Sequence, residues 1–457
     1  MNDFNQTIKI DQIPEVINKD LCIGCGLCKI PLHNKKKFSE VKMNWSKKNE
    51  IWTPKIHKSK NKNNENRICP GKKMDMPTIA NNMFGKEPKD NMVGHYKNIF
   101  AGYATNNKIR KNAASGGVTT ALLTYLFNTN VIDYAYSANG FSPHDGKGVL
   151  VKNIEGLKNC YGSHYHPINF GDALEKLVKS NKTFAFVGLP CEIAAMRQIM
   201  KFREDIKERN VIMIGLFCGG INRFSGISKY LSYFNIKGKN IEKIDYRDGV
   251  WPGQIRVTEK NKKKKQTVIP RIFKNTRINI LRYMISFQGY SMLPRCRMCP
   301  DQMADFADIS VGDPHLDRFK KKNSLGYSAI IARNSRGLKF LQQAKNKNLI
   351  KIERLSRDEL VKSQGYTLEN RRFTNVVLKL AKILKIDTPE IVNYNSNRGS
   401  LSWHQYVYAF VDLGKIKIKK YKWIKPFYLA LQIFEYLFLT FSIRLVFSRI
   451  KKILNNK

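Results

Sequence analysis

The sequence contains few acidic residues for its length. Its 457 residues include 81 lysines and arginines but only 36 aspartates and glutamates, which gives a formal net charge of +45. This excess favours acidic partners such as small electron carriers, anionic lipid or nucleic acid, although part of it is compositional background on solvated faces. No nucleic-acid-binding module or aromatic stacking signature accompanies the charge, so we expect no nucleic-acid partner.

Two other common signatures are missing. The first residues, MNDFNQTIKIDQ, lack the basic segment and apolar run of a secretory signal, so we expect a cytoplasmic protein whose cysteines are metal ligands rather than disulfides. No Gly-x-Gly-x-x-Gly motif follows a predicted strand, so a classical Rossmann dinucleotide site is not indicated. A hydrophobic content of 42% can supply the cores of two or three globular domains.

Eight of the nine cysteines fall into two sets of four. In the first set, Cys22, Cys25 and Cys28 form a Cys-x-x-Cys-x-x-Cys run, and Cys69 follows within Cys-Pro-Gly. This spacing with a distant Cys-Pro is typical of a [4Fe–4S] cluster. A structural zinc site, which also uses four thiolates, is the alternative.

The second set combines a Cys-x-x-Cys pair, Cys296 and Cys299, with two cysteines that end predicted buried strands, Cys191 and Cys218. The strand, helix, strand order between 184 and 218 predicts a parallel βαβ unit, which would bring the latter two cysteines to one rim of a sheet. Four sulfurs are enough for one cluster, although a lone thiol ending a buried strand more commonly serves packing. The remaining cysteine, Cys160, is interpreted as a buried free thiol.

A candidate ligand site begins at Ser115, Gly116 and Gly117, which precede a predicted amphipathic helix over 118–127. The free amides at a helix start can bind an anion such as a flavin pyrophosphate, although most Ser-Gly-Gly helix starts are ordinary caps. Downstream, His164 and His166 lie in an aromatic segment that we expect to line a ligand cavity, because no partner at usable spacing supports a metal site.

Two further segments carry candidate site residues. The charged and aromatic turn over 245–253 could face a substrate. Asp313 ends a short predicted strand and is either a ligand contact or a turn former. We take His164 and Asp313 as the candidate catalytic residues.

The chain is predicted to be a mixed α/β (α+β) protein with four parts. These are an amino-terminal cluster-binding module (1–95), an α/β core that contains the second set of cysteines (96–320), the end of the core with accessory helices (321–395) and a basic helical tail (396–457). Within the first part, segments over 39–45 and 50–56 predict a hairpin between the third and fourth cysteines. Alternating segments on either side of the lysine run at 262–265 predict a second hairpin.

The carboxy-terminal part differs from the rest of the chain. Residues 427–447 are long enough to span a bilayer, but a polar stripe that includes Glu435 argues against a transmembrane helix. An amphipathic helix on an anionic membrane surface fits better, and a helix packed on the protein or another subunit is the alternative. The lysines expected to favour membrane contact are Lys415, Lys417, Lys419, Lys420, Lys422, Lys425, Lys451 and Lys452.

These motifs together resemble the coenzyme F-420 hydrogenase/dehydrogenase beta subunit family, which includes 7-hydroxymethyl chlorophyll a reductase. The matching segments are CIGCGLC, CPG, KNAASGGVTTALL, YGSHY, GLPCEIAAMR, GLFCGG, WPG and CRMCPDQMADFADISVGDP, in the expected order. The sequence departs from the family pattern at His164, where relatives commonly carry lysine or arginine, and at His315, where an aromatic residue is common.

The resemblance implies an iron–sulfur flavoprotein with FAD and two [4Fe–4S] clusters, in which 1–95 is a ferredoxin-like cluster-binding module and 96–320 an α/β FAD-binding core with the inner cluster. Cys191, Cys218, Cys296 and Cys299 would hold the cluster near the flavin, and Cys22, Cys25, Cys28 and Cys69 the other. The residues implied to line the flavin are Asn112, Ser115, Gly116, Gly117, Ser163, Gly188 and Pro190.

We therefore expect an oxidoreductase that passes electrons between a ferredoxin or similar acidic carrier and an unidentified small-molecule substrate. A non-catalytic electron-transfer subunit is the second hypothesis, and a zinc-stabilised binding protein is the third. We expect a cytoplasmic location with peripheral contact at the inner membrane face, and the sequence leaves a homo-oligomer open.

Overall fold

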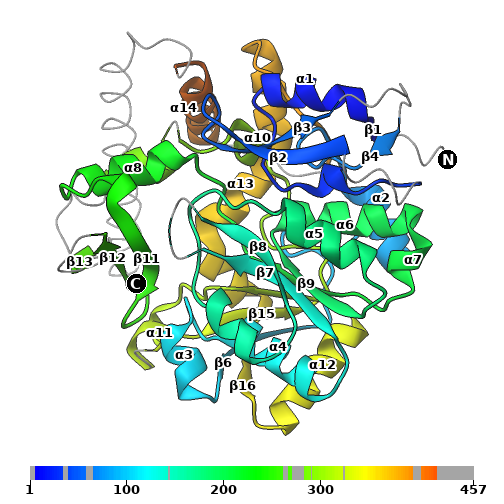
Figure 1. Ribbon diagram of the computed structural model, residues 1–457, viewed down its shortest axis with the longest axis vertical. Coiled ribbons are helices and arrows are strands. Elements are labelled where there is room, and N and C mark those ends of the chain that lie inside the picture. Colours follow the sequence, from blue (N-terminus) through cyan, green and yellow to red (C-terminus); the bar gives the residue numbers. More distant parts are fainter. Residues whose placement is uncertain are drawn as a thin grey trace, which may run out of the picture.

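The computed structural model describes residues 6–33, 40–57, 65–140, 142, 145–260, 266–269, 282–289, 291–322, 325–394 and 403–418. Figure 1 shows a large central sheet with helices on both faces and smaller strand pairs near the upper end. The mixed α/β class predicted from the sequence is confirmed, and the boundaries drawn between the four parts stay predictions.

An eight-stranded mixed sheet forms the centre of the protein. Its four middle strands run parallel, and the strands beyond them are antiparallel. In their order across the sheet, the strands are β16 (Ile350–Arg354), β6 (Asn98–Ala104), β15 (Ser328–Ala332), β14 (Ile309–Gly312), β10 (Ile212–Leu216), β9 (Phe184–Gly188), β7 (Tyr134–Asn139) and β8 (Lys147–Val151).

The middle strands are covered on both faces, which explains their continuous apolar sequences. Along β9, Phe184 and Phe186 point into one core layer, while Ala185 and Val187 point into the other. The first layer is completed by α2 (Met76–Phe84), α5 (Gly171–Lys179) and α6 (Pro190–Phe202), and the second by α4 (Val118–Asn128) and α12 (Ser335–Asn346). The strand–helix–strand order of β9, α6 and β10 confirms the predicted parallel βαβ unit.

The helix predicted at 118–127 is present as α4, but it is more deeply buried than an amphipathic surface helix. Seven of its residues are buried, including Thr124 and Tyr125. The reason is that α4 packs on the sheet and also against α12, which lies beside it on the same face.

The amino-terminal segment wraps around the upper end of this sheet (Figure 1). The predicted hairpin is confirmed as the antiparallel pair β2 (Val41–Ser46) and β3 (Ile51–Ile56). Beside it lie α1 (Ile13–Asn18) and the pair β1 (Ile8–Lys9) and β4 (Asn66–Arg67). The strand β5 (Lys73–Asp75) pairs in parallel with β17 (Glu390–Val392), which joins segments about 300 residues apart in the chain.

A separate three-stranded antiparallel sheet lies to one side of the centre (Figure 1). It consists of β11 (Ile241–Asp248), β12 (Gln254–Glu259) and β13 (Gln266–Ile269), and it packs against α8 (Phe224–Ser232). The pairing of β12 with β13 confirms the second predicted hairpin. The lysine run between them lies outside the described residues. The other short helices are α3 (Asn107–Asn112), α7 (Glu204–Lys207), α10 (Pro294–Arg297) and α11 (Asp317–Lys322).

The last described helices pack on the core. The long helix α13 (Arg357–Ile383) contacts α14 (Trp403–Ile418) through a small apolar cluster that includes Val377, Ala409 and Leu413. This packing corrects one expectation about the basic tail: Lys415 is buried and pairs with Asp412 at 3.4 Å, so it is not available to a membrane.

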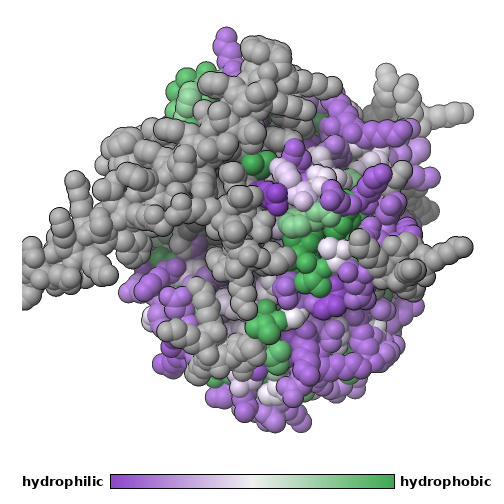
Figure 2. All heavy atoms as spheres, turned by 90° about the vertical axis from the view of Figure 1, so that its left-hand side faces the viewer, coloured by the Kyte–Doolittle hydropathy of each residue, from purple (hydrophilic) through white to green (hydrophobic). Residues whose placement is uncertain are grey.

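The rest of the expected amphipathic tail, 419–457, lies outside the described residues. Among the residues that are described, none of the helices has the length and apolar character needed to cross a bilayer. Figure 2 shows hydrophilic residues over most of the described surface on one side, in agreement with the charge of the sequence.

Candidate functional site

Four cysteines from distant parts of the chain line one small cavity at the rim of the central sheet. Cys191 lies in the first turn of α6, Cys218 follows β10, and the Cys296–Cys299 pair comes from α10 and the residues after it. The structure thus brings together the four cysteines that the sequence grouped. Proline at the first position of α6 favours the helix start that places Cys191 here.

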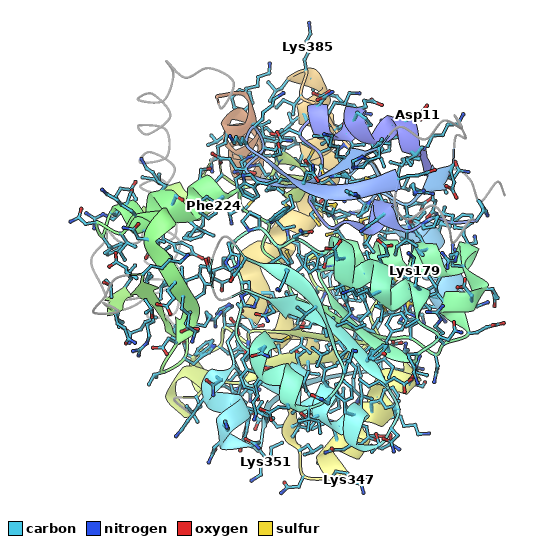
Figure 3. All side chains as sticks on the ribbon, viewed as in Figure 1. Asp11, Lys179, Phe224, Lys347, Lys351 and Lys385 are labelled. Carbon is cyan, nitrogen blue, oxygen red and sulfur yellow. The ribbon has the colours of Figure 1, made fainter. Side chains whose placement is uncertain are left out.

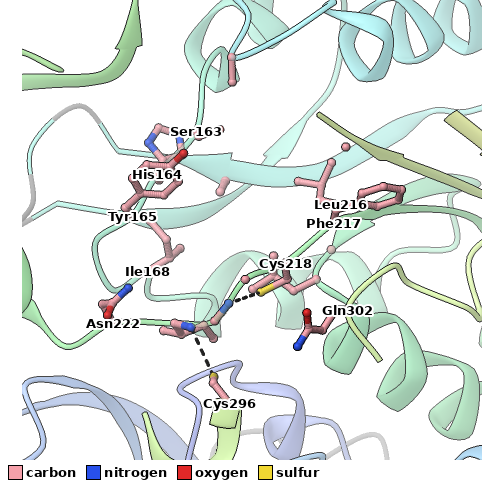
Figure 4. Close-up of a pocket in the computed structure, with 18 of the residues that line it drawn as sticks. Ser163, His164, Tyr165, Ile168, Leu216, Phe217, Cys218, Asn222, Cys296 and Gln302 are labelled. Atoms are coloured by element: carbon pink, nitrogen blue, oxygen red, sulfur yellow. Dashed lines mark hydrogen bonds between the residues drawn. The ribbon is translucent and has the colours of Figure 1, made fainter. Parts of the chain in front are cut away.

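Backbone amides already point at two of these sulfurs. The N–H of Gly220 donates to Cys218 Sγ over 3.4 Å, and the N–H of Ile221 donates to Cys296 Sγ over 3.3 Å (Figure 4). Such donors stabilise negative charge on sulfur, which a thiolate ligand carries.

The other four cysteines line a second small cavity beside α1 and β3. Cys22, Cys25, Cys28 and Cys69 share its wall with Pro54. Gly24 and Gly26 have φ of 75° and 71°, a conformation that favours glycine and lets the loop turn tightly between its cysteines. An added Cβ at Gly24 would lie 2.9 Å from Trp52 O, so the loop packs directly on β3.

Both cavities hold their thiols away from water. Burial raises the pKa of Cys22 to about 12 and that of Cys296 to about 11, and a neighbouring thiol of the same set raises each pKa further. These raised pKa values favour the protonated thiol. A bound metal would reverse that preference, because a coordinating thiol is deprotonated. Across the described part of the chain, no three or more His, Cys, Asp or Glu side chains are arranged to hold a single metal ion.

The two thiol sets are joined by a short apolar contact. Ile23 lines both small cavities and packs with Ile51 and Leu293 between Cys25 and Cys191. A buried hydrogen bond from Arg295 Nε to Pro70 O, 2.9 Å long, also ties the inner loop to the Cys69 segment. The amino-terminal loop is therefore packed against the inner site rather than connected to it by a linker.

A larger cavity of about 650 Å³ lies next to both thiol sets. Its size is in the usual range for a small-molecule or cofactor site. Cys218 and Cys296 line it from the inner thiol set, and Ile23 and Gly24 line it from the amino-terminal loop. Figure 4 shows Ser163, His164 and Tyr165 across this space from Cys218 and Gln302.

The start of α4 opens into this cavity. Ser115, Gly117 and Val118 line it, and Gly117 adopts φ 78° immediately before the helix. Gly116 lies behind the wall: its N–H donates to Ser328 Oγ, and an added Cβ would be 2.5 Å from Gly102 O. The two glycines therefore have different roles. Gly117 orients the amides at the start of α4, and Gly116 allows the loop to pack on the sheet.

His164 lies in the cavity wall with both ring nitrogens buried. Burial lowers its pKa to about 4, against smaller opposing effects from Asp245 and Asp145, so the imidazole is neutral at physiological pH. It therefore does not replace the positive charge that the family resemblance places at this position. The neighbouring His166 exchanges a hydrogen bond of 2.9 Å with the hydroxyl of Tyr246.

Arg247 supplies a positive charge from the β11 side of the cavity. Its Nη2 lies 2.8 Å from Asp313 Oδ2, and its Nη1 donates to the hydroxyl of Tyr165 over 3.4 Å. Asp313 thus lines the cavity as the partner of a buried guanidinium. The turn over 245–253, which the sequence singled out as facing a substrate, contributes Arg247 to the cavity.

The structure separates some residues that the sequence grouped. Asn112 is exposed at the end of α3, where its side chain donates to Lys108 O, and it does not line the large cavity. Pro190 lines the inner thiol cavity instead. Ser115, Gly117, Ser163, Gly188, His164 and Asp313 all line the large cavity.

Other lining residues were missed by the sequence reasoning. Glu192 follows Cys191 and contributes a buried carboxyl group, whose pKa burial raises to about 7. Val377, Ala409 and Asp412 reach the cavity from α13 and α14. No local pattern could have assigned these last three, because only the packing of the final helices brings them here.

Family models match two adjacent segments of the chain. Residues 99–175 match the amino-terminal model of the family described as coenzyme F420 hydrogenase/dehydrogenase, beta subunit. Residues 181–358 match the carboxy-terminal model of the same family. Together the two segments cover more than half of the chain and contain both the start of α4 and the inner four cysteines.

Curated relatives carry related names. The F420-dependent formate dehydrogenase subunit beta of Methanocaldococcus jannaschii is 25% identical over 284 residues, which are 61% of this chain and 66% of the relative. The coenzyme F420-dependent sulfite reductase of the same organism is 27% identical over 277 residues, 57% of this chain and 40% of the relative. The chain thus spans just under two thirds of the first relative and less than half of the second.

A solved structure shares the fold. A chain of the F420-reducing [NiFe] hydrogenase complex from Methanosarcina barkeri superposes with a TM-score of 0.50 and 18% sequence identity. The superposition covers 67% of this chain and 99% of the other.

Proposed function

Because the chain belongs to the coenzyme F420 hydrogenase/dehydrogenase beta subunit family, we propose that it is an iron–sulfur flavoprotein oxidoreductase. In this proposal it passes electrons between a ferredoxin-like carrier and a substrate through two [4Fe–4S] clusters and FAD. The observation that carries the proposal is the shared wall of the cavities: Cys218 and Cys296 line both the inner thiol cavity and the large cavity.

The residues fit two [4Fe–4S] clusters. Each small cavity is lined by four thiols, and backbone amides aim at sulfurs in both sets. Four thiolates with N–H donors are the usual surroundings of such a cluster. The inner cluster would be held by Cys191, Cys218, Cys296 and Cys299, and the outer one by Cys22, Cys25, Cys28 and Cys69.

The large cavity fits FAD. The first turn of α4 presents free backbone amides beside Ser115, and amides at a helix start favour a phosphate group. Gly188 and Ser163 supply further backbone and hydroxyl groups in the same wall. When bound, FAD converts between single electrons and electron pairs, and the clusters carry electrons singly.

The chain's own residues would orient ligands and control protons in this cavity. His164 is neutral, so one ring nitrogen can donate a hydrogen bond to a ligand and the other can accept one. Arg247, held by Asp313, provides a fixed positive charge that would favour an anionic group of the substrate. We propose His164 and Asp313 as site residues in these two roles, the second acting through Arg247.

We propose a deazaflavin coenzyme as the first substrate to test, because the curated relatives are named for F420. A tetrapyrrole and a sugar or lipid-linked intermediate are the next candidates. The departures at His164 and His315 both border the cavity, so they would affect which substrate is accepted.

A second candidate function is a non-catalytic electron-transfer subunit that feeds a partner enzyme. It is favoured by the first relative, which is named as a subunit of a larger enzyme. This alternative predicts bound flavin and clusters but no turnover by the isolated chain. Anaerobic assay with coenzyme F420 and reduced ferredoxin, with no other protein present, separates the two.

The proposal is tested by the composition of protein purified without oxygen. We expect about eight irons, a matching amount of sulfide and about one FAD per chain. Zinc in place of iron, without flavin, would contradict the proposal and favour a zinc-stabilised binding protein.

We also propose that the protein contacts anionic membranes through the basic residues after 418. The support is compositional, since lysine side chains near an anionic surface each contribute about 1 kcal/mol. The test is cosedimentation with vesicles of anionic lipid, in which the full chain should bind and a chain ending at residue 418 should not. Equal binding of both chains would exclude the tail as the contact.

A further inference from the structure

The β2–β3 hairpin packs directly on the amino-terminal cysteine loop. Pro54 of β3 lines the same cavity as Cys22 and Cys69, and Ile51 packs with Ile23 and Cys25. The hairpin is therefore the layer of protein between this thiol set and one part of the molecular surface. Figure 1 shows the hairpin at the upper end of the molecule, with β2 drawn across its near side.

The hairpin carries an unbalanced positive charge. Between 41 and 56 there are four lysines and one acidic residue, Glu50. The four lysines, all exposed, are Lys42, Lys47, Lys48 and Lys55. Lys42 lies opposite Lys55 across the two strands, and Lys47 and Lys48 form the turn.

These lysines differ from others near the same cysteines. Lys19 pairs with Glu15, and Lys73 pairs with Glu390, so the charges of both are locally balanced. None of the four hairpin lysines forms an ion pair with a described residue. Their charge is therefore free to interact with a negatively charged surface, which is the condition for electrostatic steering.

An exposed aromatic side chain, Trp45, adjoins this basic surface. It lies on the opposite face of the hairpin from Lys42 and Lys55, because side chains alternate along a strand. Trp45 is 38% exposed, unusually high for tryptophan, and lies opposite Trp52 across the hairpin. The Trp45 ring is 5.7 Å from that of Trp52 and 6.0 Å from that of Phe224, measured between centroids. Trp52 in turn lines the large cavity, so the aromatic contact runs from the surface to the wall of the proposed flavin site. An exposed aromatic residue beside charged residues is a common contact in a protein interface.

We propose that the basic surface formed by Lys42, Lys47, Lys48 and Lys55, together with the adjoining Trp45, is the docking site of an acidic electron-carrier protein. The inference rests on the proposed function and names the point at which electrons enter. The carrier's negative charge faces the lysines, and its redox centre approaches the Cys22–Cys69 site through the single layer of β3. One electron leaves the reduced carrier for each electron that the cluster at this site accepts, so the exchange is balanced without another reactant.

The test compares two triple variants of equal net charge. The first carries Lys42→Glu, Lys47→Glu and Lys48→Glu on the hairpin. The matched control carries Lys339→Glu, Lys347→Glu and Lys351→Glu, three exposed lysines of α12, β16 and the turn between them. Lys347 and Lys351 lie at the opposite end of the molecule from the hairpin (Figure 3). Iron content and the visible spectrum of each variant establish that both cysteine sites are intact.

The readout is the second-order rate at which a reduced, acidic 2[4Fe–4S] ferredoxin bleaches the cluster absorbance in anaerobic stopped flow. At low ionic strength we expect the hairpin variant to react at least about tenfold more slowly than the wild type, and the control to stay within about twofold. At high ionic strength the difference should shrink, because salt screens exposed charges. Trp45→Ala should lower the rate at both ionic strengths, since its contact is apolar.

Equal slowing of both triple variants would overturn the proposal, because it would show that the total charge matters and the location does not. Unchanged rates in both would also overturn it. A wild type that contains iron and FAD but is not reduced by ferredoxin would overturn the docking site while leaving the proposed cofactors in place. Zinc without iron would instead remove the proposed function itself.

Discussion

Arg247 and Asp313 form an ion pair across the wall of the large cavity, with 2.8 Å between Nη2 and Oδ2. The pair links β11 of the small sheet to the end of β14 in the central sheet. Both side chains are largely buried, with exposed fractions of 6% and 17%. The carboxylate of Asp313 therefore holds the guanidinium of Arg247 in place.

Asp313→Asn should lower the free energy of unfolding by about 3 kcal/mol, because it leaves the buried Arg247 without its counter-charge. The matched control is Asp248→Asn, which breaks an exposed ion pair with Arg256 on the same sheet and should cost less than about 1 kcal/mol. Urea unfolding of the two variants measures the difference. An Asp313→Asn protein of wild-type stability that has lost activity would show instead that the carboxylate acts in the chemistry.

Removing one cysteine should remove one cluster and leave the other. Cys299→Ser should lower the iron content from about eight to about four per chain, because a serine oxygen is a poor substitute for a thiolate at an iron–sulfur centre. Cys28→Ser should have the same effect on total iron through the other site, and the two variants should differ in their electron paramagnetic resonance spectra. Cys160→Ser is the control, since Cys160 belongs to neither set and should keep all the iron. Unchanged iron in Cys299→Ser would contradict the assignment of the inner site.

A negative charge at the start of α4 should displace the flavin. Ser115→Asp places a carboxylate where the proposed phosphate binds, and we expect the purified protein to lose most of its FAD while keeping its iron. Asn112→Asp adds the same charge three residues earlier, outside the cavity, and should retain FAD. Flavin absorbance per chain is the measurement. Equal FAD loss in both variants would mean that the cofactor lies elsewhere or extends over α3.

His164 should make stability depend on pH in the acidic range. Its pKa in the folded protein is about 4, below the ordinary value of 6.5, so the unfolded chain binds a proton that the folded chain does not. Stability is therefore lost as the pH falls through this window, by about 2 kcal/mol between pH 7 and pH 5. The charged groups facing the imidazole are Asp245 and Asp145, which only partly offset the effect of burial.

The measurement is anaerobic urea unfolding at pH 7 and pH 5. His164→Gln should reduce the pH-dependent loss by about 2 kcal/mol relative to the wild type. His57→Gln, which removes an exposed histidine, should leave the loss unchanged. Identical pH dependence in the wild type and His164→Gln would show that His164 is not buried in a neutral state.

Much of the site could be predicted from the sequence, because the cysteine spacing and the side-chain patterns that indicate it each lie within a short segment. The spacing of Cys22, Cys25 and Cys28 limits these thiols to one short loop, and alternation of side chains identifies the hairpin that follows. The run of buried residues in β9 and β10 predicts two neighbouring parallel strands, which brings Cys191 and Cys218 together. For the two cysteine sets, the choice between iron and zinc was left open, because both metals use four thiolates.

The sequence by itself determined which cysteines group together, where the chain turns and which strands are covered on both faces. These properties depend on residue type and on spacing within a few residues. The tertiary structure alone decided that Asn112 lies outside the cavity, that Asp313 faces Arg247 and that Lys415 is buried against Asp412. It also decided that Ile23 lies at the junction of all three cavities. The physical reason is that each of these contacts depends on how separate elements pack together, and side-chain packing between distant segments leaves no periodic pattern in the sequence.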